Sequence, residues 1–361
     1  MTAASVSMAR FAPEQLFAAV PAGHFDLPQT STRLWGPKPL SYRSGWQGFG
    51  FDTVRGRIYY AQPSPLGTSG SVTDAKIAGN FRISYLNMDG SRNDGDYMEF
   101  YGFGHAGSIG IETTSSNTYI WVETDSELRG TYRYGKRICV IKWRDNATGP
   151  YTYSDIGTSK LPDSHQYILK PGSHENSVNI DPVTKRLMLR FYWDGGQQNG
   201  TGPTFKEGPY YSVYNLADVR ASAGGAVPLY DFMRESIILT QTDGTKYGPH
   251  QGFANYGDYG YILTGGKYET CTISGSSDTH LTCFQFVPAT DPVTSSPKYS
   301  VGVHTGESLY YREPEGLAIH LSGSTPRLCL GIKSDTDCSD STYDQVMSVY
   351  YKDKIITTAI P

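Results

Sequence analysis

The feature that most constrains the fold is a short pattern occurring five times between residues 46 and 320. Each copy has a polar residue, usually a small one after it, an apolar strand, a turn and a second apolar strand. The clearest copy is Tyr310–His320, and earlier copies begin at Trp46, His105, His174 and His250. The steps are 60, 69, 75 and 64 residues if the equivalent positions are Gln47, Gly107, Asn176, Gln251 and Glu315. Five units of a few strands each predict a five-bladed β-propeller.

The composition agrees with this prediction. A chain of 361 residues is long for one core, but a repeat architecture adds a layer of core with each unit. The 28 tyrosines and 40 glycines, with only 18% charged residues, are typical of short strands joined by tight turns. A net charge of −4 gives no basic field for nucleic acid. No apolar run approaches the roughly 20 residues that span a bilayer.

We expect one propeller domain over residues 25–361, preceded by a leader or short helix over residues 1–24. Within that leader, Pro13–Val20 has a sequence suited to two helical turns. A propeller must close its ring, and the terminal segments 25–34 and 346–351 are the natural closing pieces. The Gly-, Gln- and Asn-rich stretch at 195–209 is expected to be an exposed loop.

The cysteines suggest local cross-links. Cys271 and Cys283 flank one short polar loop, and Cys329 and Cys338 flank another, which predicts two loop-closing disulfides and leaves Cys139 free in an apolar strand. Disulfides indicate an oxidising compartment, although five reduced thiols remain the alternative. Residues 1–20 contain no secretion signal, so we expect either a signal removed earlier or export by another route, as in a virion.

Several motifs together resemble one protein family. They are Gln47-Gly48-Phe49 with Arg57-Ile58-Tyr59, Gly104-His105 with Tyr119-Ile120-Trp121, Asp181-Pro182 before Arg186-Leu187, and Tyr311-Arg312-Glu313-Pro314-Glu315-Gly316 with Arg327-Leu328-Cys329-Leu330-Gly331. The chain resembles, from residue 25 onward, the β-propeller shared by proteins called teichoic acid biosynthesis protein C and by receptor-binding proteins of phages of Gram-positive bacteria. The resemblance implies a five-bladed propeller, a cell-wall glycopolymer as partner, and an extracellular, cell-surface or virion location.

The residues that open the five copies should converge at one mouth of the central channel, because the first strand of each blade lines that channel. The predicted ligand-binding set is Trp46, Gln47, His105, His174, Glu175, His250, Gln251, Arg312 and Glu315. Glu313, Arg190, Tyr192 and Glu123 are expected neighbours. Asp52, Glu112 and Asp181 recur at the opposite end of the strand and are expected to be structural.

Three functions fit this set. The first is glycan binding, in which amide, imidazole and carboxylate groups bond sugar hydroxyls and Trp46 offers an apolar face. The second is glycan cleavage by His105, His174, His250, Glu313 or Glu315. Glu313 and Glu315 are two apart, so their expected separation of roughly 6.5–7 Å is near that of inverting glycosidases.

A His or Tyr base with Arg312 on a uronate would instead indicate a polysaccharide lyase. The third function is a scaffold, in which the polar groups only close the channel. Three histidines could hold a metal, but nothing in their spacing favours one, and we predict no metal or cofactor.

Overall fold

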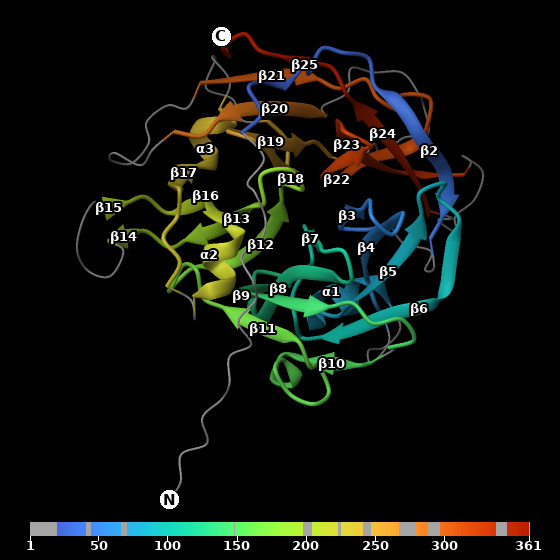
Figure 1. Ribbon diagram of the computed structural model, residues 1–361, viewed down its shortest axis with the longest axis vertical. Helices are drawn as coiled ribbons and strands as arrows, with labels where there is room; N and C mark the ends of the chain where they lie inside the picture. The colour runs from blue at the N-terminus through green and yellow to red at the C-terminus, as the bar shows by residue number, and fades with distance from the viewer. Residues whose placement is uncertain are drawn as a thin grey trace, which may run out of the picture.

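The computed structural model describes residues 20–40, 45–65, 71–147, 149–197, 204–222, 225–240, 247–266, 279–287, 297–336 and 345–360. Its main sheets, which we number blades one to five in chain order, follow one another in a ring (Figure 1). One sheet has five strands and the other four have four strands each. The prediction of a five-bladed β-propeller is confirmed.

In each blade the strands follow one another from the channel outward. From its innermost strand, blade one comprises β3 (Gly48–Asp52), β4 (Arg57–Pro63), β5 (Phe81–Asn87), β6 (Arg92–Tyr101) and β10 (Tyr151–Thr152). Blade two comprises β7 (Gly110–Thr113), β8 (Thr118–Arg129), β9 (Tyr132–Lys142) and β11 (Ser164–Tyr167). Blade three comprises β12 (His174–Ile180), β13 (Arg186–Trp193), β16 (Gly208–Asn215) and β17 (Tyr230–Arg234).

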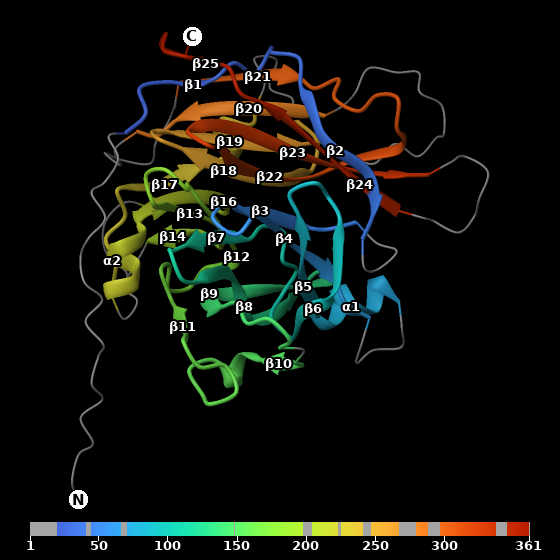
Figure 2. The same ribbon diagram turned by 45° about the vertical axis from the view of Figure 1, so that its right-hand side comes forward.

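Blade four comprises β18 (His250–Tyr256), β19 (Tyr259–Thr264), β20 (His280–Gln285) and β21 (Lys298–Gly302). Blade five comprises β22 (Tyr310–Ser322), β23 (Thr325–Asp335), β24 (Gln345–Lys352) and β2 (Thr32–Pro39). The outermost strand of blade five therefore comes from the start of the chain, and both ribbon views place it beside β24 (Figures 1 and 2). The pairing of β2 with β24 is the closure predicted from the terminal segments, and a two-stranded sheet of β1 (His24–Phe25) and β25 (Ile355–Ile356) adds a second link that was not predicted.

Hydrophobic side chains between neighbouring blades form the core. Each blade interface has its own cluster of buried residues. In one of them, Tyr59 and Ile83 of blade one pack against Ile109 and Ile120 of blade two. The strands alternate inward and outward, so both faces of an inner hairpin such as β3–β4 are buried between two neighbours. This explains why the strands read as nearly continuous apolar runs.

Short helices join some strands and were not predicted. They are α1 (Val72–Ala78), η1 (Tyr153–Asp155), α2 (Leu216–Ala221) and α3 (Glu235–Ile238). The side chain of Ser71 caps α1 by accepting from the backbone N–H of Asp74, and Gly79 ends it in the left-handed region at φ 71°. Among the described residues, no helix is long and apolar enough to cross a membrane.

The Gly195–Pro209 segment differs from the exposed loop expected of it. Its two ends form a small hairpin of β14 (Gly196–Gln197) and β15 (Thr204–Phe205), while residues 198–203 lie outside the described part. Phe205 is buried and stacks on Phe232, with ring centroids 3.8 Å apart. One aromatic side chain thus anchors a stretch that reads as polar. Most of the predicted leader helix, up to residue 19, also lies outside the described residues.

The three cysteines of the described residues pack in the core rather than at loops. Cys139, Cys283 and Cys329 are free, fully buried thiols in β9, β20 and β23, and burial raises the pKa of each. For Cys139 this is the predicted state. Cys283 and Cys329 differ from the loop-closing role predicted for them, because both side chains belong to inter-blade clusters. Their predicted partners, Cys271 and Cys338, lie outside the described residues.

Candidate functional site

Small residues let the innermost strands approach one another at the channel. Each of the five equivalent positions, four of them polar, is followed by Gly or Ser: Gly48, Ser108, Ser177, Gly252 and Gly316. A Cβ atom on Gly48 would lie 2.8 Å from the Cα of Ser108, and one on Gly252 would lie 2.6 Å from the Cα of Gly316. The small residue of the repeat is therefore a packing requirement that brings the polar residues before it close together.

Irregular pairing at the strand starts turns these polar side chains toward the axis. The pairing of β12 with β13 shifts register between His174 and Ser177, and that of β18 with β19 shifts between His250 and Gly252. The pairing of β22 with β23 shifts between Pro314 and Leu317. The residues inside these shifts include Glu175, Asn176, Gln251 and Glu315. A bulge re-aims a side chain, which is what places these groups in the channel.

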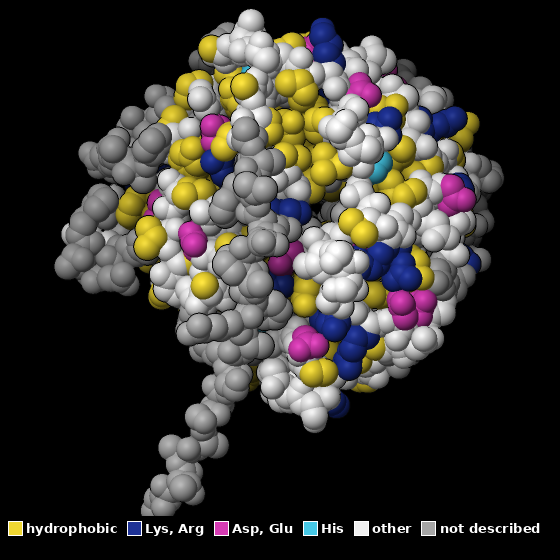
Figure 3. Space-filling view, viewed as in Figure 1, with side chains coloured by type: hydrophobic (Ala, Val, Ile, Leu, Met, Phe, Trp, Pro, Cys, Tyr) yellow, Lys and Arg dark blue, Asp and Glu magenta, His cyan; other side chains and the backbone are white. Residues whose placement is uncertain are grey.

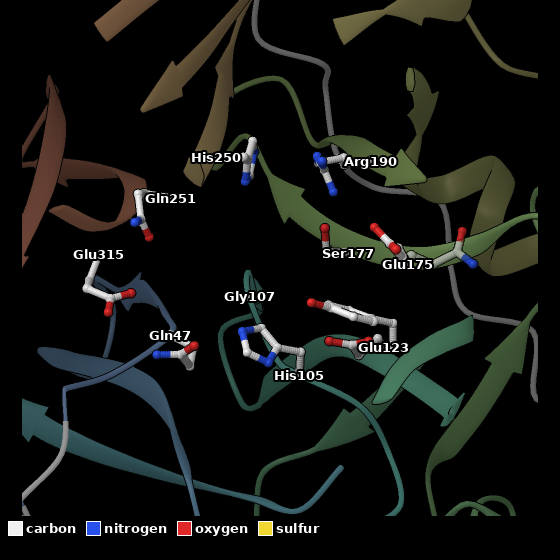
Figure 4. A pocket seen from close by; sticks show the side chains of 12 residues that line it. Gln47, His105, Gly107, Glu123, Glu175, Ser177, Arg190, His250, Gln251 and Glu315 are labelled. Atoms are coloured by element: carbon white, nitrogen blue, oxygen red, sulfur yellow. The ribbon is translucent and has the colours of Figure 1, made fainter. Parts of the chain in front are cut away.

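The result is a pocket of about 200 Å³ at the centre of the ring (Figure 4). The blades follow one another clockwise in Figure 1 and anticlockwise in Figure 4, so the close-up looks from the opposite face. The lining residues are Gln47, His105, Gly107, Glu123, Tyr134, Glu175, Asn176, Ser177, Arg190, His250, Gln251 and Glu315. Figure 3 shows the same face as Figure 1, and there the hydrophobic, basic and acidic side chains of the described residues are interspersed.

All five positions taken as equivalent in the sequence line this pocket. So do His105, Glu175 and His250 from the predicted set, and Arg190 and Glu123 from the expected neighbours. Tyr134 and Ser177 were missed. Ser177 could have been found, because it is the small residue of its repeat, whereas Tyr134 lies on a second hairpin strand and carries no repeat signal.

Two predicted ligand-binding residues are instead part of the core. Trp46 is fully buried, stacks on Phe49 at 4.5 Å, and donates from Nε1 to the carbonyl oxygen of Glu315 at 2.7 Å. Its ring therefore offers no face to a sugar. Arg312 is 2% exposed and donates to the carbonyl oxygens of Thr305 and Val303 at 2.6 and 2.9 Å. Its guanidinium ties a loop to β22.

His174 and Glu313 also lie outside the pocket lining. The imidazole of His174 stacks on Tyr192 with centroids 4.8 Å apart, and its Nε2 is 2.9 Å from Oδ1 of Asp194. Glu313 forms an ion pair with Lys333, which also contacts Glu315. Both carboxylates thus share one ammonium, so they do not flank an open position as the predicted inverting pair would.

On the blade five side, Lys333 balances the charge of Glu315. Its Nζ lies 2.8 Å from Oε1 of Glu315. Burial raises the pKa of Glu315 and Lys333 opposes that shift, while Glu315 and Glu313 raise the pKa of Lys333 against its burial. The amides of three pocket residues donate to backbone carbonyls: Gln47 to Trp46 at 3.3 Å, Gln251 to Gly265 at 2.7 Å and Asn176 to Gly135 at 3.2 Å.

Arg190 is neutralised in the same way on blade three. Its Nε and Nη2 donate to the two oxygens of Glu235 at 2.7 and 3.1 Å, and Tyr211 donates to Oε2 of Glu235 at 2.6 Å. Burial opposes ionisation of Glu235, but Arg190, with a smaller contribution from Tyr211, lowers its pKa to about 2. The guanidinium therefore reaches the pocket already paired.

Glu123 is an acid held by backbone groups. It is 2% exposed and accepts from the N–H groups of Ala106 and Gly135. Burial raises its pKa to about 8, and the negative charge of Glu175 adds to this, while the N–H donors oppose it. Burial, Glu175 and Glu123 also raise the pKa of Tyr134 to about 12.

The two pocket histidines have unsatisfied nitrogen atoms. Nδ1 of His105 and Nε2 of His250 are buried without a hydrogen-bond partner among the described residues. Burial, with the charge of Lys76, lowers the pKa of His105 to about 3. Burial, with the charge of Arg190, lowers that of His250 to about 3 as well. Both imidazoles are neutral at physiological pH, so each has one donor and one acceptor nitrogen.

Three acids at the opposite ends of the inner strands are bonded within the protein. Asp181 accepts from the N–H groups of Val183 and Gly257, both at 2.8 Å, and from Thr184 Oγ1 at 2.5 Å. Asp52 accepts from Thr118 of the next blade, and Glu112 from Arg220. Each acid links its blade to a neighbour, which agrees with the structural role predicted for them.

Comparison with known proteins finds similar folds but no similar sequences. No family model matches the sequence, and no curated protein matches it. Among solved structures, the tail fibre of Staphylococcus aureus phage P68 has a TM-score of 0.58 at 16% identity, over 90% of this chain. The fold resembles that of a phage tail fibre. The match covers 52% of the tail fibre, so this chain corresponds to about half of that protein.

A more distant likeness involves an α-L-arabinofuranosidase from Lactobacillus brevis. It has a TM-score of 0.42 at 10% identity, over 85% of this chain and 90% of that one, which is too low to argue from. Within the described residues, no group of three His, Cys, Asp or Glu side chains is arranged to hold a metal ion.

Proposed function

We propose that the protein recognises a glycan in the central pocket. The observation that carries this proposal is the pair of buried imidazole nitrogens, His105 Nδ1 and His250 Nε2, which belong to residues lining the pocket and have no partner among the described residues. A buried polar group left unsatisfied costs about 1–3 kcal/mol. The amides and neutral imidazoles both donate and accept, as sugar hydroxyls do. A hydroxyl-rich ligand therefore matches the lining.

The partner we propose is a cell-wall glycopolymer, encountered by a protein that is extracellular or carried on a virion. Two separate observations support this: the motif resemblance centred on Arg312-Glu313-Pro314-Glu315-Gly316, and the propeller shared with a phage tail fibre. The fold alone does not specify the sugar. The volume of the pocket, about 200 Å³, and its polar lining favour a terminal or branching sugar over a long stretch of polymer.

The test is a binding screen on purified wall polymers and a glycan array, with histidine variants as matched probes. His250→Ala removes one pocket imidazole, and His165→Ala removes an exposed one on β11. We expect His250→Ala to weaken binding about five- to tenfold, the effect of one hydrogen bond, and His165→Ala to bind as the wild type does. Equal binding by both variants would exclude the pocket as the site.

Glycan cleavage at the same pocket is a second candidate, and one observation favours it. Glu123 lies in the pocket with a pKa of about 8, which suits a general acid at neutral pH. In this function Glu123 donates the proton to the leaving oxygen. A reducing-end assay and an absorbance assay for unsaturated products should then detect turnover that Glu123→Gln abolishes while binding persists.

A further inference from the structure

Two groups of charged side chains around the pocket balance their own charges. On the side of blades five and one, Glu315 and Glu313 face Lys333, and Lys76 of α1 adds a second positive charge that acts on Glu315. On blade three, Arg190 is matched by Glu235. These two groups leave no net charge for a ligand to neutralise.

The wall formed by Glu123, Tyr134 and Glu175 is different. Glu123 has only backbone N–H donors, and no cationic side chain is paired with it in the described structure. Among the described residues, the ion-pair contact of Glu175 is with the imidazole of His174, at 3.9 Å, and that ring is bonded to Asp194. The charge of Arg190 also acts on Glu175, but its guanidinium is bonded to Glu235. The side chain of Glu175 is 25% exposed and held on a residue with φ 53°. Two carboxyl groups therefore share this wall, and neither forms an ion pair with a Lys or Arg side chain of the described residues.

We propose that the glycan bound in this pocket carries a protonated amine, which sits against Glu123 and Glu175. This deepens, and rests on, the proposed glycan recognition. An ammonium has three donors and no acceptor, so it can bond to both carboxylates and to an acceptor nitrogen such as the unpartnered Nδ1 of His105. The aromatic face of Tyr134 is a further favourable surface for a cation.

An anionic sugar fits the pocket less well. A uronate or phosphate needs an unpaired cation, but Arg190 already makes a two-point contact with Glu235. It would also approach the carboxylate of Glu175 against its charge. The residues thus select an amino sugar, or a sugar bearing an aminoacyl group, over an acidic one.

The experiment compares two ligands that differ only in the amine. Chitosan tetrasaccharide has free ammonium groups, and chitin tetrasaccharide has the same groups acetylated. Binding to the full chain is measured by calorimetry at pH 6.5 and low salt, with tetragalacturonate as an anionic control. We expect chitosan tetrasaccharide to bind at least tenfold more tightly than either, with a preference that shrinks as salt rises.

Two variants test whether the carboxyl groups of Glu175 and Glu123 bind the ammonium group. Glu175→Gln should remove most of the preference while leaving the chitin tetrasaccharide affinity within twofold, and Glu123→Gln should do the same if it folds. Glu127→Gln is the matched control, since Glu127 lies on β8 with Glu123 but pairs with Arg129 at 2.8 Å. It should keep the preference.

The outcomes separate this inference from the proposed function. Equal affinity for the free-amine and the acetylated tetrasaccharide, or a preference that survives both Glu175→Gln and Glu123→Gln, overturns the ammonium assignment and leaves glycan recognition standing. Tighter binding of tetragalacturonate also overturns it. If His250→Ala changes the affinity for none of these saccharides and for no polymer of the wider screen, both proposals fail.

Discussion

The two ends of the innermost strands use similar residues for different purposes. At one end Asp52, Glu112 and Asp181 find donors in neighbouring elements and hold the blades together. At the other end His105 and His250 keep buried nitrogens without partners among the described residues. Near the propeller axis, three acids are therefore satisfied within the fold, while two imidazole nitrogens of the pocket lack a partner among the described residues.

Asp181→Ala is the strongest test of the hydrogen bonds that hold the blades together at the end of the inner strands away from the pocket. It leaves the donors of Val183, Thr184 and Gly257 without an acceptor in a buried site. We expect a loss of about 3–5 kcal/mol in the free energy of unfolding, measured by urea titration. Asp218→Ala, exposed on α2, should change it by less than about 0.5 kcal/mol. Similar losses in the free energy of unfolding for Asp181→Ala and Asp218→Ala would show that the buried hydrogen bonds of Asp181 do not stabilise the fold.

At the pocket end, Glu123 should make stability depend on pH. Its folded pKa of about 8 is above the unfolded value, so its contribution is fully present below about pH 4.3 and is lost as pH rises through 8. From this carboxyl alone we expect the free energy of unfolding to fall by up to about 1.4 kcal/mol per pH unit between pH 5 and 8.

The measurement is urea unfolding of the wild type and Glu123→Gln at pH 5, 6, 7 and 8. The variant cannot ionise at this position, so its pH dependence should be shallower in that window. Parallel curves would show that the backbone N–H donors, rather than burial, control the ionisation of Glu123.

The close approach of the inner strands can be tested with two glycines of the ring. A methyl group on Gly252 would lie 2.6 Å from the Cα of Gly316, whereas one on Gly107 would have its nearest neighbour, a ring carbon of His105, at 3.7 Å. Gly252→Ala should therefore lower the free energy of unfolding by about 1–3 kcal/mol. Gly107→Ala should leave the melting temperature nearly unchanged, and equal losses would contradict the packing requirement at Gly252.

The smallest expected effect separates two histidines that look alike in the sequence. His174 is bonded to Asp194 and stacked on Tyr192, so His174→Ala should cost about 1 kcal/mol of stability and change glycan affinity less than twofold. His250→Ala should show the reverse. Thermal denaturation and calorimetry on the same samples give both numbers, and a binding loss in His174→Ala would extend the site beyond the pocket.

Repeat spacing predicted the fold and the five ring positions, because equivalent residues of a closed ring must surround one axis. It could not predict which neighbours of those positions share the pocket. Glu313 and Glu315 both contact the ammonium of Lys333, but only Glu315, inside the register shift between Pro314 and Leu317, lines the pocket. Trp46 immediately precedes Gln47 and turns into the core instead. Tyr134 lies outside the repeat and appears in the pocket only once β8 and β9 pair.

The strand pair that closes the ring has a consequence for synthesis of the chain. Thr32 of β2 pairs with Tyr351 of β24, so the two partners leave a ribosome about 320 residues apart. At 5–20 residues per second, β2 waits roughly 15–65 s for its neighbour. Until then β2 has no strand to pair with, so completing the circle is a late event in the synthesis of the chain.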